Sequence, residues 1–284
     1  MSGAMMAPAL SSISAALGTS PEDANLALYI FILAFAFGPL VLEPCTEIVG
    51  RKPMTVSQKL RISLLKPFTL LATQPILQIM SLFLAYNFGI LYIVLATFAT
   101  IWIDVYYQTL TTSGLHYISL AVGYTLAAQI GGPLTDRIWN HLQAKHDGNT
   151  APEYRVPLML PSIFLIPAGL FWYGWSVHAQ THWAVVDVGI GVFGCGIILG
   201  TQSMQAYVLD AFPDHTASAS AASQFLRNLF AFAFPIFTPS LYRELGYGWG
   251  NSLLAFLFIA LGVPAPLIPW RYGATLRGKG EPQA

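Results

Sequence analysis

The sequence predicts an all-α protein whose helices cross a membrane, and its composition and the length of its apolar segments support this prediction. Hydrophobic residues make up 55% of the 284 residues, whereas charged residues make up only 9%. Soluble domains carry roughly 25% charged residues, so this chain has too little charge to cover a surface that faces water. A helix needs about 20 mostly apolar residues to cross a bilayer. Segments that meet this requirement lie at approximately 24–42, 76–103, 115–133, 156–179, 183–208, 218–241 and 249–272.

The individual segments carry features typical of membrane helices. Residues 24–42, 76–103 and 115–133 are predicted from apolar character alone. Trp102, Trp183 and Trp249 stand at the ends of segments, where amphipathic rings favour the interface between lipid and water. In the fifth segment, the spacing of Gly196 and Gly200 lets two helices approach closely. Other segments carry prolines that begin or kink helices, at Pro157, Pro161, Pro167, Pro235, Pro239, Pro264, Pro266 and Pro269.

The distribution of lysine and arginine predicts which way the segments run through the membrane. Basic residues are retained on the cytoplasmic side of short connections. They gather in alternate connections, as Arg51, Lys52, Lys59, Arg61, Lys66, Arg137, Lys145, Arg155, Arg271, Arg277 and Lys279, whereas only Arg243 lies on the opposite side. With seven spans, this pattern predicts an external N-terminus and a cytoplasmic C-terminus.

Several classes of function are disfavoured by what the sequence lacks. The formal net charge is zero and no basic tract or phosphate-binding glycine loop is present, so no nucleic acid partner is expected. Cys45 and Cys195 are expected to pack rather than to form a disulfide. No histidine, cysteine or carboxylate pattern suits a membrane metalloenzyme, and the last apolar segment has no lysine for an opsin-type chromophore. We therefore expect no cofactor, no metal and no catalysis, and a seven-span enzyme or receptor is the less favoured alternative.

Two copies of a short acidic-then-basic motif follow apolar segments. The first is Gly132-Pro133-Leu134-Thr135-Asp136-Arg137, and a looser copy is Thr46-Glu47-Ile48-Val49-Gly50-Arg51-Lys52-Pro53. Each is expected to form a hairpin at the membrane edge. Further apolar stretches accompany them, including Pro167-Ala168-Gly169-Leu170-Phe171-Trp172, Asp210-Ala211-Phe212-Pro213 and Gly248-Trp249-Gly250-Asn251-Ser252. In combination these motifs resemble the fungal drug:proton antiporter group of the major facilitator superfamily.

The resemblance implies a domain organisation with a large internal gap. Residues 1–75 resemble a remnant of the first half of such a transporter, with one span, a motif loop and a cytoplasmic linker. Residues 76–272 resemble the second six-helix half, and residues 273–284 form a cytoplasmic tail. Most of the family's first helix and all of its helices three to six have no counterpart. Because the four spans missing between the first motif and the second half are an even number, every later segment keeps its side of the membrane.

The resemblance also implies a truncated transporter whose full-length relatives export small organic molecules or secondary metabolites in exchange for protons, by alternating access. The alternatives are a transport-incompetent fragment or an accessory membrane subunit. Expected partners are the lipid bilayer, a small organic substrate, protons, and a second copy or another transporter. The family default is the plasma membrane, with the vacuolar membrane next.

Polar residues within or beside the spans are the candidate site. The mixed aromatic, amide and basic groups expected to contact substrate are Tyr86, Asn87, Tyr92, Tyr124, Gln129, Gln202, Gln205 and Arg227. Those expected to latch helix ends through charge pairs are Glu47, Gly50, Arg51, Lys52, Gly132, Asp136 and Arg137. Asp187, about one turn inside its span, is the candidate for proton coupling. The alternative for each is a packing or interhelical hydrogen-bonding role.

Overall fold

The computed structural model describes residues 30, 33–34, 37–40 and 56–278, and this part of the chain is helical with no strand. The helices in order are α4 (Val56–Thr73), α5 (Pro75–Thr100), the π-helix η2 (Ile101–Val105), α6 (Leu110–Leu115), α7 (Tyr117–Lys145), the 3-10 helix η3 (Pro152–Met159), α8 (Leu160–His178), α9 (Trp183–Ala211), the short η4 (Pro213–His215), α10 (Thr216–Gly262) and α11 (Pro264–Gly278). The expected span at 24–42 lies mostly outside the described residues.

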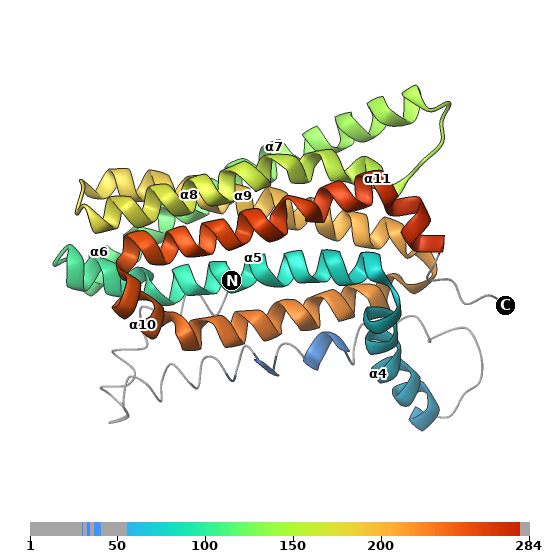
Figure 1. Ribbon diagram of the computed structural model, residues 1–284, viewed down its shortest axis with the longest axis horizontal. Coiled ribbons are helices and arrows are strands. Elements are labelled where there is room, and N and C mark those ends of the chain that lie inside the picture. Colours follow the sequence, from blue (N-terminus) through green and yellow to red (C-terminus); the bar gives the residue numbers. More distant parts are fainter. Residues whose placement is uncertain (1–29, 31–32, 35–36, 41–55, 279–284) are drawn as a thin grey trace.

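The long helices lie side by side along the longest axis of the molecule (Figure 1). Helix α5 packs against α10, α8 packs against both α9 and α10, and α7 packs against α9. Helix α10 is two limbs joined at Gly246, whose φ of +67° belongs to a region that glycine enters without steric cost. The chain reverses there, and α11 continues the direction of the second limb (Figure 1). The two limbs therefore correspond to the expected spans 218–241 and 249–272.

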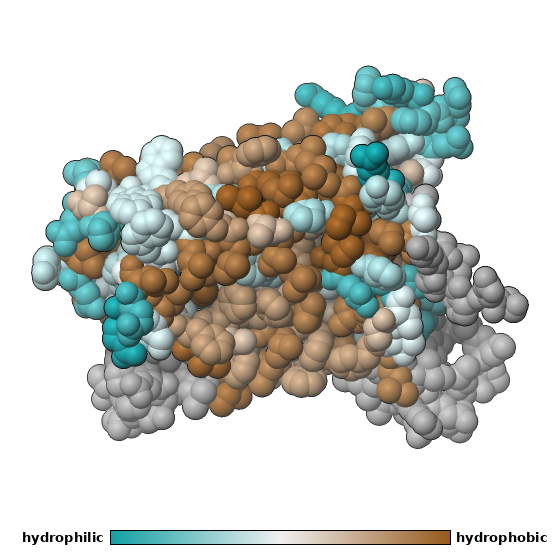
Figure 2. Space-filling view, viewed as in Figure 1, coloured by the Kyte–Doolittle hydropathy of each residue, from teal (hydrophilic) through white to brown (hydrophobic). Residues whose placement is uncertain are grey.

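An apolar band covers the middle of the bundle, and hydrophilic residues gather at its two ends (Figure 2). Four segments are long and apolar enough to cross a membrane: Pro75–Val105, Pro152–His178, Trp183–Ala211 and Pro213–Gly273. The last of these contains the turn at Gly246, so it supplies both limbs. Helix α7, at the expected span 115–133, has 29 residues but is too polar to meet the same criterion.

One predicted boundary is wrong. The expected hairpin at Gly132–Arg137 does not form, because α7 continues through Pro133 to Lys145. Proline removes one backbone hydrogen bond without preventing the helix from continuing on both sides, and the extension packs against η3. The expected linker before residue 75 contains α4, which contacts the first limb of α10 through Phe68 and Phe225, with ring centroids 5.2 Å apart. Helix–helix packing thus stabilises helical structure in residues that lie outside the apolar segments.

Small residues set the spacing between α8 and α9. A side chain at Gly169 would place its Cβ 2.5 Å from the backbone nitrogen of Phe193, and one at Gly196 would place its Cβ 2.9 Å from the backbone nitrogen of Ile166. The two backbones touch at both places. Membrane helices gain no hydrophobic energy by leaving lipid, so this close contact is a main source of their association.

Replacing Gly169 by alanine is expected to destabilise the bundle by about 1–3 kcal/mol, because neither backbone can move away without losing contacts elsewhere. The matched control is Gly191→Ala on α9, where the new Cβ would meet its nearest atom at an ordinary 3.5 Å. Denaturant unfolding in detergent measures both variants. Equal stabilities of the two variants would contradict this account of α8–α9 packing.

Candidate functional site

Three of the predicted substrate-binding residues come together from three different helices. Tyr92 on α5, Tyr124 on α7 and Arg227 on the first limb of α10 are all half-buried. Arg227 and Tyr92 are near enough to interact electrostatically, and so are Tyr92 and Tyr124. Two phenol groups and one guanidinium from three helices therefore lie near one another within the apolar band.

Arg227 is held by contacts with its neighbours. Its guanidinium carbon lies 4.4 Å from the centre of the Phe88 ring on α5, and its Nη2 donates to Gln224 Oε1 at 2.8 Å. A cation over an aromatic face is stabilised by the ring's quadrupole, more strongly where water is scarce. These contacts fix the position of a charge that lies inside an apolar segment.

Tyr86 and Asn87 lie inside the packing of the helices instead of on an open face. Tyr86 is buried, and its hydroxyl donates to the carbonyl oxygen of Leu254 at 3.1 Å. Asn87 is fully buried, and neither polar atom of its side chain has a hydrogen-bond partner. A side chain at Gly200 would place its Cβ 3.6 Å from Asn87 Nδ2, so this amide lies where α5 meets α9.

The three predicted glutamines lie along α7 and α9. Gln129 and Gln202 are exposed and Gln205 is half-buried. A Cβ at Gly131 of α7 would be 3.3 Å from Gln202 Oε1, so this amide lies beside α7. Amide groups are thus presented outward from the middle of two adjacent helices.

The predicted latch residues of the second motif lie on the extended part of α7. Gly132, Asp136 and Arg137 are exposed, and within the described part of the chain neither charged side chain forms an ion pair. The first-motif residues Glu47, Gly50, Arg51 and Lys52 lie outside the described residues.

At this end of the bundle an ion pair joins Arg155 and Asp210 instead, and the sequence did not predict this pair. Arg155 Nε donates to Asp210 Oδ2 at 2.8 Å, and this links η3 to the C-terminal end of α9. The Arg155 guanidinium also lies over the Trp139 ring of α7, 4.3 Å from its centroid. Because its partners are 55 residues apart, no short sequence pattern marks this contact. We call this end of the bundle the basic end.

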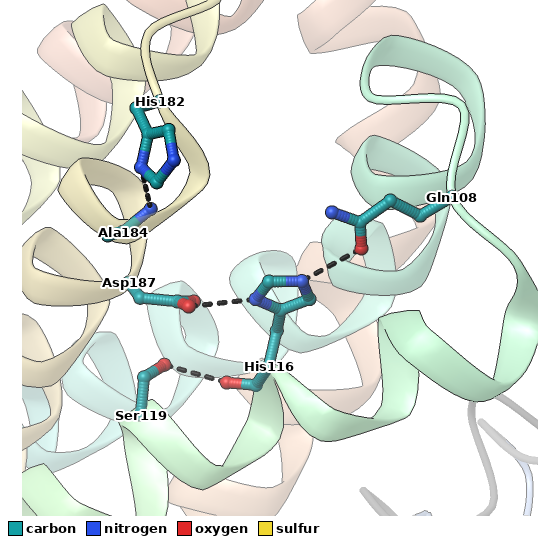
Figure 3. A network of polar contacts seen from close by, with 6 residues as sticks. All are labelled: Gln108, His116, Ser119, His182, Ala184 and Asp187. Atoms are coloured by element: carbon teal, nitrogen blue, oxygen red, sulfur yellow. Dashed lines mark hydrogen bonds and ion pairs between the residues drawn. The ribbon is translucent and has the colours of Figure 1, made fainter.

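At the opposite end, Asp187 has a partner that the sequence analysis missed (Figure 3). His116 Nδ1 lies 2.8 Å from Asp187 Oδ2, and His116 Nε2 lies 2.8 Å from Gln108 Oε1. The His116 ring also stacks on Trp102, with centroids 3.6 Å apart and planes at 9°. His116 stands between α6 and α7 and looks like an ordinary interface residue in sequence, so only the fold could show the pair.

The apolar band, the hydrophilic ends and the deep polar groups define an integral membrane protein that crosses the bilayer several times. Residues 55–235 match the Major Facilitator Superfamily, and the chain belongs to this superfamily.

Fungal transporters are among its relatives. The chain is 46% identical to the MFS-type transporter oryF of Aspergillus oryzae over 217 residues, 76% of this chain and 45% of that protein. It is 41% identical to the efflux pump vrtL of Penicillium aethiopicum over 232 residues, 82% of this chain and 46% of that protein. The MFS transporter cpaT of Aspergillus oryzae is 36% identical over 262 residues, 88% of this chain and 53% of that protein. The chain thus spans about half the length of the curated relatives it matches.

Removing the Arg155–Asp210 pair is expected to reveal a coupling of about 0.5–1 kcal/mol in a double-mutant cycle with Arg155→Ala and Asp210→Ala, because both side chains remain partly exposed to solvent. The control cycle uses Arg243 and Glu244, which lie 3.6 Å apart and are about three-quarters exposed. Denaturant unfolding in detergent supplies the free energies. A coupling at the first pair no larger than at the control pair would show that the basic end is not held by this contact.

Proposed function

We propose that this chain forms one six-helix half of a transporter that moves a small organic molecule across a membrane. Support comes from the superfamily match and from the relatives, which are named as transporters and efflux pumps. Membership alone does not specify what a chain of this length does. The proposal therefore depends on the polar groups that the bundle presents within its apolar band.

The exposed amides of Gln129 and Gln202 carry this proposal. A polar group that faces lipid has no partner to replace water, and burying it in hydrocarbon costs several kcal/mol. Two such groups on neighbouring helices are consistent with a face that meets water or a second polar surface. Half-buried Arg227 supports the same reading, because ionisable residues at membrane depth normally face a cavity or a partner.

The chemistry of this face suits an amphipathic organic molecule. Tyr92 and Tyr124 offer aromatic surface with hydroxyl groups, Gln202 and Gln205 offer amides, and Arg227 offers a positive charge. Binding sites for small molecules commonly combine an apolar wall with a few polar groups that fix orientation. Tyr86 and Asn87 would contribute by shaping the helices behind this face.

The remaining assignments complete the proposal. Residues 76–272 form the six-helix half, residues 1–75 the remnant of the other half, and residues 273–284 a tail. Asp136 and Arg137 would latch the cytoplasmic end to a partner helix, together with the first-motif residues. Asp187 would couple transport to protons, in a plasma membrane with the C-terminus inside.

A second half is needed because transporters of this architecture hold substrate between two halves and alternate access by rocking one against the other. A second copy of this chain, or another transporter, would supply it. An accessory subunit or a transport-incompetent fragment is the alternative, and the exposed amides would then face a partner protein instead of a substrate path.

Water access to the proposed face is expected to be detectable by cysteine labelling. In a background with Cys45→Ser and Cys195→Ser, Gln129→Cys and Gln202→Cys should react with a membrane-impermeant maleimide in proteoliposomes. The matched control is Phe164→Cys on α8, which is 74% exposed in the bundle but belongs to an apolar segment expected to face lipid. Reaction of the control at the same rate as both glutamine positions would remove the evidence for a polar path.

Transport itself is tested with the chain in proteoliposomes that carry a pH gradient, using as the probe the anionic amphipathic dye sulforhodamine B, whose charge is opposite to that of Arg227. Dye movement should exceed that of protein-free liposomes, and Arg227→Ala should slow it about tenfold, the factor that corresponds to about 1.4 kcal/mol of lost binding. Arg243→Ala, at an exposed site outside this face, should leave the rate unchanged. Dye movement equal to that of protein-free liposomes would reject transport by this chain.

A further inference from the structure

The side chains around His116 form a compact polar cluster at the end of the bundle opposite the basic end (Figure 3). His116 is only 8% exposed, and its two ring nitrogens contact Asp187 and Gln108. Trp102, which is fully buried, covers one face of the imidazole. The ring is therefore held on two edges and one face by residues of η2, the η2–α6 connection and α9.

The hydrogen-bond geometry determines how many protons this cluster holds. Gln108 presents its carbonyl oxygen Oε1 to Nε2, and Asp187 presents a carboxylate oxygen to Nδ1. A neutral imidazole has one donor and one acceptor nitrogen, whereas the cationic ring donates from both. With an oxygen on each side, both ring nitrogens donate and the pair holds one proton more than a neutral histidine beside a charged aspartate; with the Gln108 amide rotated, its nitrogen donates to Nε2 and the ring is neutral.

We propose that His116 and Asp187 form a proton-binding site that, when occupied, fastens α9 to the η2–α6 segment. The proton comes from water at this end of the bundle and is retained between the imidazole and the carboxylate. When it leaves, one ring nitrogen becomes an acceptor and faces an oxygen that also accepts. The contact to Gln108 or the contact to Asp187 must then open or rearrange.

The η2–α6 segment that contains Gln108 has an irregular backbone, so loss of the Gln108 contact would affect how this segment is held. The backbone N–H of Gln108 donates to the carbonyl of Trp102 at 2.9 Å, across the π-helix η2. The preceding residue, Tyr107, has a φ of +54°, which is uncommon for a residue with a side chain. A π-helix and a strained residue next to each other commonly mark a functional segment.

Another polar atom beside the pair, Trp102 Nε1, is buried and has no hydrogen-bond partner among the described residues. Trp102 and Tyr106 lie with ring centroids 5.0 Å apart. A buried donor or acceptor without a partner is costly, so this cluster retains polar groups at the expense of stability. Such an arrangement is expected at a site that changes its protonation state.

The two ends of α9 are fastened in different ways. Asp210 near its C-terminal end pairs with Arg155, which stays charged at every physiological pH. Asp187 near its N-terminal end pairs with His116, which carries a charge only when it is protonated. One ion pair therefore involves a constant charge, and the other depends on whether His116 holds a second proton.

Other titratable or charged side chains lie on the elements that meet at this end. They are Asp104, Tyr106, Tyr117, His178, His182, Arg243, Glu244 and Tyr247. Asp104, His182, Arg243 and Glu244 are exposed, so solvent screens their effect on the pair. Among the described residues, Asp187 is the carboxylate that contacts His116.

The role of this pair in coupling rests on the proposed transport function. Proton binding by the pair can be tested separately, because both residues belong to this chain. The test therefore measures protonation without any substrate. A protonated imidazole accepts an electron from an excited indole more readily than the neutral ring does, so it quenches tryptophan fluorescence. Trp102 lies in direct contact with His116 and serves as the internal reporter.

The experiment is a pH titration of tryptophan fluorescence from about pH 5 to 8, with the full chain in lipid nanodiscs. The difference between the native chain and Trp102→Phe isolates the reporter. Its fluorescence should rise as the pH increases and the proton leaves, and His116→Gln should abolish this transition. Asp187→Asn should move the transition to lower pH by about one unit or more, because the cation loses its neighbouring negative charge.

The matched control is His182→Gln, an exposed histidine at the same end whose ring lies 5.0 Å from that of Trp183. This variant should keep the transition, which excludes quenching of Trp183 by His182 as its source; the difference from Trp102→Phe separates Trp102 from Trp183, whose ring lies 5.9 Å from that of His116. Circular dichroism and elution as a single species show that each variant is folded. A transition that is absent from the native chain, or that persists in His116→Gln, would overturn the proposed site. Absence of dye transport with an intact titration would count only against the proposed function.

Discussion

Hydrocarbon offers no partner to a polar group, and this constraint organises the bundle. Within the described part of the chain, deep hydroxyl side chains mostly bond to a carbonyl one turn back in their own helix, and some polar side chains find partners across helices. Ser81 and Ser223 share a hydrogen bond of 2.8 Å between α5 and α10, and Asn251 joins the two limbs of α10 by accepting from Tyr242 at 3.1 Å. Such bonds add only about 0.6 kcal/mol each on average in membranes. Their greater effect is to allow one relative placement of the helices.

Some exceptions to this rule lie in the regions of functional interest. Asn87 and Trp102 keep buried polar atoms without partners, and Gln129 and Gln202 turn amides outward from the apolar band. In a membrane each exception lowers stability, because water cannot compensate for the missing bond. A protein that retains them obtains groups that can bind another molecule or a proton. At the candidate substrate face and at the His116–Asp187 site, the protein keeps polar groups that can bind a substrate or a proton, although these groups lower its stability.

Helix α9 connects these regions. Its glycines allow α8 to approach closely, its central glutamines belong to the proposed substrate face, and its two aspartates pair at opposite ends. A rigid helix transmits a displacement at one end to the other end. Asp210 is bound to an arginine with a constant charge, whereas Asp187 is bound to a histidine with a variable one. Any movement of α9 that depends on protonation would therefore begin at the His116 end.

Local properties of the sequence determined the class of the protein. The apolar runs predicted membrane helices near their observed positions, since length and hydropathy are fixed by adjacent residues, and the motif combination correctly indicated the superfamily. The helical path through Pro133 was missed, because packing against η3 decides whether a helix ends at a proline. Of the polar residues, Tyr92, Tyr124 and Arg227 come together, whereas Tyr86 turned out to be packed inside. Only tertiary structure brought His116 to Asp187, 71 residues away, and Arg155 to Asp210. Pairing across such distances depends on how whole helices rotate and pack, and no local pattern in the sequence encodes that.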